Sequence, residues 1–130
     1  MRQKARVLIV EDDLAMITML QSMLEDEGFE TKSAVGEKAL KLAEVYQPDV
    51  ILLDIMMPVM DGLEWSNRAK ANPNLAKIPI IALSAASFTT LKRTFKDLQA
   101  DSFVSKPFEI DTLLNLIYSF SGQHQHQLHP

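Results

Sequence analysis

The chain has 130 residues with 17 acidic and 13 basic side chains, which gives a formal net charge of −4 at pH 7. This length suits one domain with a single core, and the acidic balance argues against direct nucleic-acid binding. The absence of cysteine excludes disulfides and thiol chemistry. No segment is apolar over a membrane-spanning length and no signal segment precedes the first strand, so we expect a cytoplasmic protein without a membrane partner.

Strand and helix patterns alternate five times along the chain. Apolar runs without alternation are typical of strands buried on both faces of a parallel sheet. The expected strands are residues 7–10, 29–34, 50–53, 78–83 and 102–105. The expected helices are residues 14–27, 37–46, 63–71, 90–98 and 111–120. Gly28 is expected just after the first helix, whose inward side should carry Leu14, Met16, Ile17, Leu20, Met23 and Leu24. The alternation predicts a doubly wound α/β fold with a parallel sheet.

The most apolar segment of the chain ends in a carboxylate. Residues 50–53 read Val-Ile-Leu-Leu, and Asp54 follows directly. Pro58 prevents a longer strand, and Asp61-Gly62 supplies a turn before the next helix. A carboxylate so close to a hydrophobic core is costly unless another group compensates its charge. The sequence must therefore bring a cation towards Asp54.

Polar residues follow four of the expected strands. They are the pair Glu11-Asp12, then Asp54, Ser84 and Lys106. Right-handed crossovers place the carboxyl ends of parallel strands at one edge, so these side chains should share a cleft. Three carboxylates beside one lysine suit Mg2+, which prefers hard oxygen ligands. Such a set has the parts needed to form and hold an aspartyl phosphate, with Asp54 as the nucleophile.

These residues belong to longer motifs. The motifs are Val-Glu-Asp-Asp at 10–13, Leu-Leu-Asp-Ile-Met-Met-Pro at 52–58, Met-Asp-Gly at 60–62, Leu-Ser-Ala at 83–85 and Lys-Pro-Phe at 106–108. In their order and spacing, the sequence resembles the receiver domain of bacterial two-component response regulators of the CheY type. The resemblance extends from Arg6 to about Phe120. It implies the strand order 2-1-3-4-5 and a receiver domain over residues 1–121, followed by a flexible tail over 122–130 whose three histidines we interpret as solvated.

The resemblance also implies a role for each residue of the site. Asp54 would be the phosphoacceptor, and the Mg2+ ligands would be Glu11, Asp12, Asp54 and the backbone carbonyl of Met56, with Asp12 a direct ligand. Ser84 and Lys106 would contact the phosphoryl oxygens, Lys106-Pro107 would be a cis peptide, and Phe103 would be the aromatic switch residue. Met16, Pro107 and Phe108 are candidate contacts for a docking partner.

The implied function is that of a signalling switch rather than a metabolic enzyme. A histidine kinase or histidine phosphotransfer protein would donate the phosphoryl group, and the Ser84 hydroxyl would move towards it. Phe103 would then turn inward and change the surface of the fourth helix, the fifth strand and the fifth helix. The domain, alone or as a fragment of a larger protein, would act on a downstream protein, with room for a phosphorylation-dependent dimer.

Some residues depart from the pattern of the family. Ser84 stands where threonine is more frequent, Phe103 where tyrosine is, and Gln99 where a glycine commonly ends the fourth helix. Met56 and Ala86 occupy positions that tune hydrolysis in the family, and neither can orient a water molecule. We therefore expect a phosphoryl group that lasts minutes or more.

Other interpretations of the same residues explain the sequence less well. Asp13 is better explained as a helix N-cap than as part of the acidic pair. A nucleotide or flavin enzyme would need a glycine-rich phosphate loop, which the chain lacks. A Mg2+-dependent phosphohydrolase would need a second acid where Met56 stands. An interaction module with a vestigial pocket is disfavoured by the complete set of site residues.

Overall fold

The computed structural model describes residues 4–55, 62–84 and 99–122. Five parallel strands form one sheet in the order β2-β1-β3-β4-β5. The strands are β1 (Arg6–Val10), β2 (Glu30–Ala34), β3 (Val50–Asp54), β4 (Ile80–Ser84) and β5 (Ser102–Ser105). The predicted fold and strand order are confirmed, and the polar strand β2 lies at an edge, as expected.

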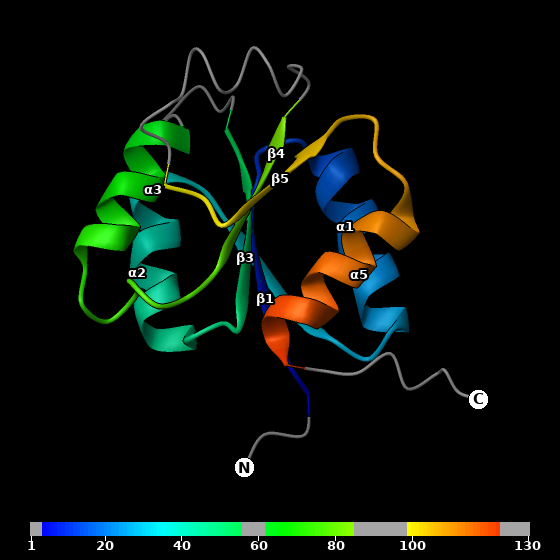
Figure 1. Cartoon of the computed structure of the whole chain (residues 1–130), viewed down its shortest axis with the longest axis horizontal. Helices are drawn as coiled ribbons and strands as arrows, with labels where there is room; N and C mark the ends of the chain where they lie inside the picture. Colours follow the sequence, from blue (N-terminus) through cyan, green and yellow to red (C-terminus); the bar gives the residue numbers. More distant parts are fainter. Residues whose placement is uncertain (1–3, 56–61, 85–98, 123–130) are drawn as a thin grey trace.

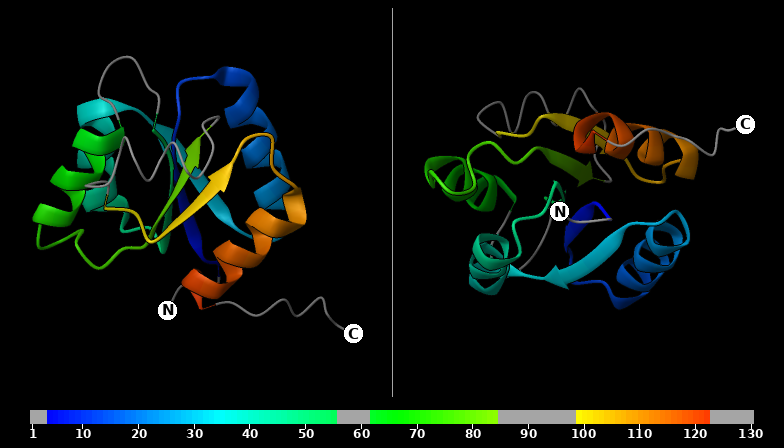
Figure 2. Two further views of the ribbon diagram at one scale, coloured as in Figure 1. Left: turned by 45° about the horizontal axis from the view of Figure 1, so that its top comes forward. Right: turned by 90° about the horizontal axis from the view of Figure 1, so that it is seen from below.

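In the described part of the chain, helices cover both faces of the sheet (Figure 1). They are α1 (Leu14–Asp26), α2 (Gly36–Tyr46), α3 (Gly62–Ala71) and α5 (Ile110–Ser121). Figure 2 shows α1 and α5 on one side of the sheet and α2 and α3 on the other. Among the described residues, no helix has the length and apolarity needed to cross a membrane. The helix predicted at residues 90–98 lies outside the described residues.

The ends of α1 follow from its sequence. Asp13 is the N-cap, and its Oδ1 accepts hydrogen bonds from the N–H groups of Ala15 at 3.0 Å and Met16 at 3.4 Å. Gly28 follows the helix with a φ of +92°, a conformation that glycine adopts easily. The N-cap interpretation of Asp13 and the predicted helix end are therefore confirmed.

Two strands begin later than predicted because turns occupy their first residues. The N–H of Ile78 donates to the carbonyl of Leu75 at 3.0 Å, and β4 begins only at Ile80, after Pro79. The N–H of Phe29 likewise donates back to Leu24 at 3.0 Å, so β2 begins at residue 30. Apolar patterning does not distinguish these turn residues from strand residues.

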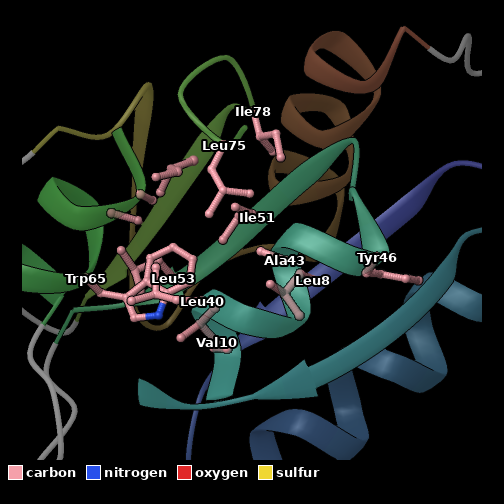
Figure 3. Close-up of a cluster of buried hydrophobic side chains, with 14 of the residues drawn as sticks. Leu8, Val10, Leu40, Ala43, Tyr46, Ile51, Leu53, Trp65, Leu75 and Ile78 are labelled. Carbon is pink, nitrogen blue, oxygen red and sulfur yellow. The ribbon is translucent and has the colours of Figure 1, made fainter. Parts of the chain in front are cut away.

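The apolar strands divide their side chains between two cores. Odd-numbered residues of β1 face α1 and α5, whereas even-numbered residues face α2 and α3. The second core contains side chains from β1, β3, β4, α2 and α3, many of which Figure 3 labels. Both faces of the central strands are thus buried, which explains why their sequences show no alternation.

The expected inward position of Leu14 is wrong, because this side chain is 77% exposed. At 3.6 residues per turn, Leu14 points about 120° away from Leu20 around the helix axis. Leu20 and Leu24 are fully buried and define the inward side of α1. Leu14 therefore contributes an apolar side chain to the surface.

Trp65 joins α3 to α2 inside the second core. Its side chain is fully buried within the core (Figure 3). Its indole N–H donates to the carbonyl of Gly36 at 3.1 Å. Arg68 joins the same two helices on the surface, where it forms a bidentate ion pair with Glu37 at 2.7 and 2.9 Å. The two contacts differ mainly in their exposure to water.

Trp65→Phe should lower the free energy of unfolding by about 2 kcal/mol, because it removes buried volume and leaves the Gly36 carbonyl without its donor. Arg68→Ala should have a much smaller effect, since water screens its exposed ion pair. Urea unfolding followed by circular dichroism measures both. Equal losses for the two variants would contradict this account of how α2 and α3 are joined.

Candidate functional site

The polar residues predicted at the strand ends lie at one edge of the sheet. Glu11 follows β1, Asp54 ends β3, Ser84 ends β4 and Lys106 follows β5. The strand register aligns these ends, since Asp54 pairs with Leu83 and the N–H of Lys106 donates to the carbonyl of Ser84. This edge is the upper end of the sheet in Figure 1.

Three carboxylates meet at this edge. Glu11, Asp12 and Asp54 each offer an oxygen within 4.8 Å of those of the other two. Glu11 is 2% exposed and Asp54 is 7% exposed, whereas Asp12 is open to solvent. The fold therefore brings Asp54 to a pair of acids that lie more than forty residues earlier in the chain.

Lys106 supplies a positive charge at the same place. Its Nζ lies 3.5 Å from Oε1 of Glu11 and 3.6 Å from Oδ1 of Asp54. The side chain of Lys106 is 21% exposed, so water screens these ion pairs only in part. One lysine thus neutralises part of the charge of three carboxylates.

This arrangement raises the pKa of the Glu11 carboxyl group above its ordinary value. Burial raises the pKa of Glu11, and the Asp54 carboxyl raises it further through a hydrogen bond and charge repulsion. The N–H of Asp13, 3.2 Å from Oε2, and Lys106 act in the opposite direction. Oε1 of Glu11 is buried and accepts no hydrogen bond from the described residues. The carboxylate cluster is therefore short of positive charge.

The residues fit a divalent cation with a preference for oxygen. The cluster offers carboxylate oxygens and no histidine or cysteine, which is the ligand chemistry of Mg2+. The buried Oε1 of Glu11 pairs with Lys106 at 3.5 Å but accepts no hydrogen bond from the described residues. Glu11, Asp12 and Asp54 would hold the ion. Met56, whose backbone carbonyl was the fourth expected ligand, lies outside the described residues, as does Ala86.

The two expected switch residues lie on neighbouring strands. Ser84 is fully buried at the end of β4. Phe103 lies on β5 opposite Ala82, is half-buried, and packs against the core on the α2 and α3 side. The Lys106-Pro107 peptide bond is cis, as the resemblance implied.

The expected docking residues line an apolar pocket beside Lys106. Its volume is about 230 Å3, and its lining residues are Met16, Met19, Lys106, Pro107, Phe108 and Ile110. Met19 and Ile110 were not predicted from the sequence. Met19 lies three residues after Met16 on the same helix, and this spacing is the signal that could have identified it. The pocket joins α1 to the start of α5.

Comparison with known proteins agrees with this architecture. The model of the response regulator receiver domain matches residues 7–118. The polar-differentiation response regulator DivK of Brucella abortus is 32% identical over 117 residues, which cover 89% of this chain and 95% of that protein. The probable transcriptional regulator ycf29 of Pyropia yezoensis is 37% identical over 113 residues, which cover 86% of this chain. This chain spans about half the length of ycf29 and similar relatives.

A solved structure gives the same result for the fold. The receiver domain of a sensor histidine kinase from Pseudomonas aeruginosa PAO1 is similar with a TM-score of 0.84 and 27% identity. The similarity covers 92% of this chain and 99% of that domain, whose structure has a magnesium ion coordinated in the active site cleft. The family match extends over most of the chain and includes the acidic residues at the edge of the sheet. This protein therefore belongs to the response regulator receiver domains.

Proposed function

We propose that Asp54 accepts a phosphoryl group from a phosphohistidine of a histidine kinase or histidine phosphotransfer protein. The supporting observation is the cluster of Glu11, Asp12 and Asp54 beside Lys106 at the carboxyl edge of the sheet. In the transfer, the bond between phosphorus and the histidine nitrogen breaks while a bond to a carboxylate oxygen of Asp54 forms. The domain catalyses this transfer to its own side chain.

The charge of the edge suits this reaction. Three carboxylates would repel a phosphoryl donor, and Lys106 offsets one of their charges. Mg2+, when bound, supplies two further positive charges and neutralises charge that develops on the phosphoryl oxygens. Lys106 then contacts one of those oxygens and contributes to the same stabilisation. With Mg2+ bound, the three carboxylates, Lys106 and the ion carry no net charge before the donor arrives.

Ser84 and Phe103 transmit the modification. Ser84 lies at the end of β4, beside the end of β3. From there its hydroxyl would contact a phosphoryl oxygen on Asp54. Its inward movement leaves space on β5 that the half-buried ring of Phe103 fills. Both conformations exist before phosphorylation, and the phosphoryl group shifts their populations. A downstream protein then recognises the changed surface around β5 and α5.

The apolar pocket beside Lys106 receives the donor protein. Met16 and Met19 on α1 line it together with Phe108 and Ile110, and Met19 and Ile110 are exposed. The apolar face of a helix carrying the phosphohistidine fits such a surface, because methionine side chains adapt to varied partners. Docking there brings the donor to the edge where Lys106 and Asp54 lie.

Incubation with acetyl phosphate and Mg2+ should add one phosphoryl group to the protein, detected by intact mass. Asp54→Asn should abolish the adduct, since an amide oxygen does not act as the nucleophile. Removal of Mg2+ should also abolish it. Asp13→Asn is the matched control, because asparagine caps a helix as well as aspartate does. Unchanged labelling of Asp54→Asn would refute the proposal.

Glu11→Gln should raise the thermal unfolding midpoint of the metal-free protein at neutral pH, because it removes a buried carboxylate that Asp54 repels. A raised pKa means that the folded protein favours the protonated group. The carboxylate therefore lowers stability above that pKa, and this effect fades as the pH falls to the ordinary value of 4.5. The gain from Glu11→Gln should fade over the same range.

Thermal scans between pH 4 and pH 8 with and without Mg2+ measure this effect, since the raised pKa places the change above about 4.5. Added Mg2+ should stabilise the wild type more than Glu11→Gln, because the variant lacks one ligand charge. A variant that is less stable than the wild type at neutral pH without metal would contradict the expected repulsion.

Met56→Asn should shorten the lifetime of the phosphoryl group. Asparagine can orient a water molecule for attack on phosphorus, whereas the methionine of the natural chain cannot. The loss of label from purified phosphoprotein over time measures the rate. An unchanged rate would show that residue 56 does not limit hydrolysis in this protein.

A further inference from the structure

Gly62 is in closer contact with the end of β3 than any other residue type would allow. A Cβ atom added to Gly62 would overlap Cα of Ile55 and would lie 2.6 Å from its Cβ and Cγ2. The N–H of Gly62 donates to the carbonyl of Ile55 at 3.2 Å. The first residue of α3 thus rests directly on the residue that follows Asp54.

The sequence suggests a different reason for this glycine. Asp61-Gly62 is typical of a turn, where glycine is used for its positive φ. Gly28, Gly36 and Gly122 have positive φ, whereas Gly62 does not. The backbone of residue 62 would therefore accept alanine, which is a better helix former than glycine. Space, rather than conformation, requires glycine at this position.

Neither side of the contact can move away easily. Ile55 is fully buried and its N–H donates to the carbonyl of Leu83 at 3.3 Å, which ties it to β4. On the other side, α3 is held by the fully buried Trp65 and its hydrogen bond to Gly36. An added methyl group would have to displace the strand end, the helix start or both.

The strand end carries the chemistry of the site. Asp54 immediately precedes Ile55. Leu83, whose carbonyl accepts the hydrogen bond from Ile55, immediately precedes Ser84. A displacement of Ile55 would therefore move Asp54, to which it is joined by a peptide bond. It would also move Ser84, because Ile55 is hydrogen-bonded to the carbonyl of Leu83, the residue before Ser84. We propose that Gly62 is a positioning residue that sets the place of Asp54 relative to the carboxylate pair by letting α3 start in direct contact with Ile55.

Gly62→Ala should weaken Mg2+ binding and slow phosphorylation by acetyl phosphate, each by about ten-fold or more, since displacements well under 1 Å impair such sites. Calorimetric titration with Mg2+ gives the affinity, at a temperature where circular dichroism shows each variant to be folded. The phosphorylation readout rests on the proposed function, whereas the Mg2+ readout requires only the cation site.

Gly28→Ala is the matched control. It makes the same substitution at a glycine whose Cβ would meet nothing within 4 Å, and its positive φ makes alanine unfavourable. This variant should lose stability and keep the Mg2+ affinity of the wild type. A folded Gly62→Ala protein with wild-type affinity and rate would overturn the proposal, as would equal effects of the two variants on affinity.

A metal-free measurement separates this inference from the function. Backbone amide chemical shifts of Gly62→Ala without Mg2+ should change at Asp54 and Ser84, whereas changes confined to α3 would overturn the inference. If the wild type failed to bind Mg2+ or to accept a phosphoryl group, the proposed function would be contradicted. The chemical-shift comparison of the metal-free proteins would still test the role of Gly62.

If Gly62→Ala does not fold, Ile55→Ala replaces it, because this variant removes Cγ2 from the same contact. Its control is Leu75→Ala, which opens a comparable cavity in the same core. Weaker Mg2+ binding in Ile55→Ala alone supports the inference, and equal binding by the two variants overturns it.

Discussion

The repulsion between Glu11 and Asp54 is the constraint on which the site depends. Both carboxylates follow fully buried strand residues, so their backbones cannot retreat into water. Burial and the neighbouring charge raise the pKa of Glu11, and Lys106 offsets the negative charge only in part. The hydrophobic effect that forms the sheet therefore holds together charges that would otherwise separate. This stored repulsion is what a bound cation can relieve.

The opposite edge of the sheet shows how the same fold treats acids that serve structure. Asp49 accepts the backbone N–H of Arg6 at 2.8 Å, and Asp101 accepts that of Ile80 at 2.7 Å. Asp101 also pairs with Lys70 at 3.1 Å. At that edge each acid accepts a hydrogen bond from the first backbone N–H of a strand. At the carboxyl edge, by contrast, Glu11 and Asp54 lie next to each other. The acids at the opposite edge therefore stabilise the fold, whereas the close carboxylates at the carboxyl edge cost stability and form the cation site.

The sequence predicts the fold and the shared edge of the site because both depend on short-range patterns. Buried strands lack alternation, and parallel connections bring their carboxyl ends together. The exposure of Leu14 was missed because an apolar residue in the first turn resembles its inward neighbours. The sequence does not reveal the contact between Gly62 and Ile55, because a turn at Asp61-Gly62 already accounts for the glycine. Side-chain space around a glycine depends on the packing of α3, which no local pattern encodes.

A phosphoryl group on Asp54 would meet a frame whose strand ends are already joined. Ile55 bonds to Leu83, and Ser84 bonds to Lys106, so the ends of β3, β4 and β5 are linked in series by backbone hydrogen bonds. Rotation of a side chain does not change these backbone hydrogen bonds. A phosphoryl group can shift the equilibrium between two states only if it interacts more favourably with one of them. Under the proposed function, the difference between the two states arises in side chains, chiefly the Ser84 hydroxyl and the Phe103 ring. A rigid frame with two adjustable groups suits a switch that small contacts can control.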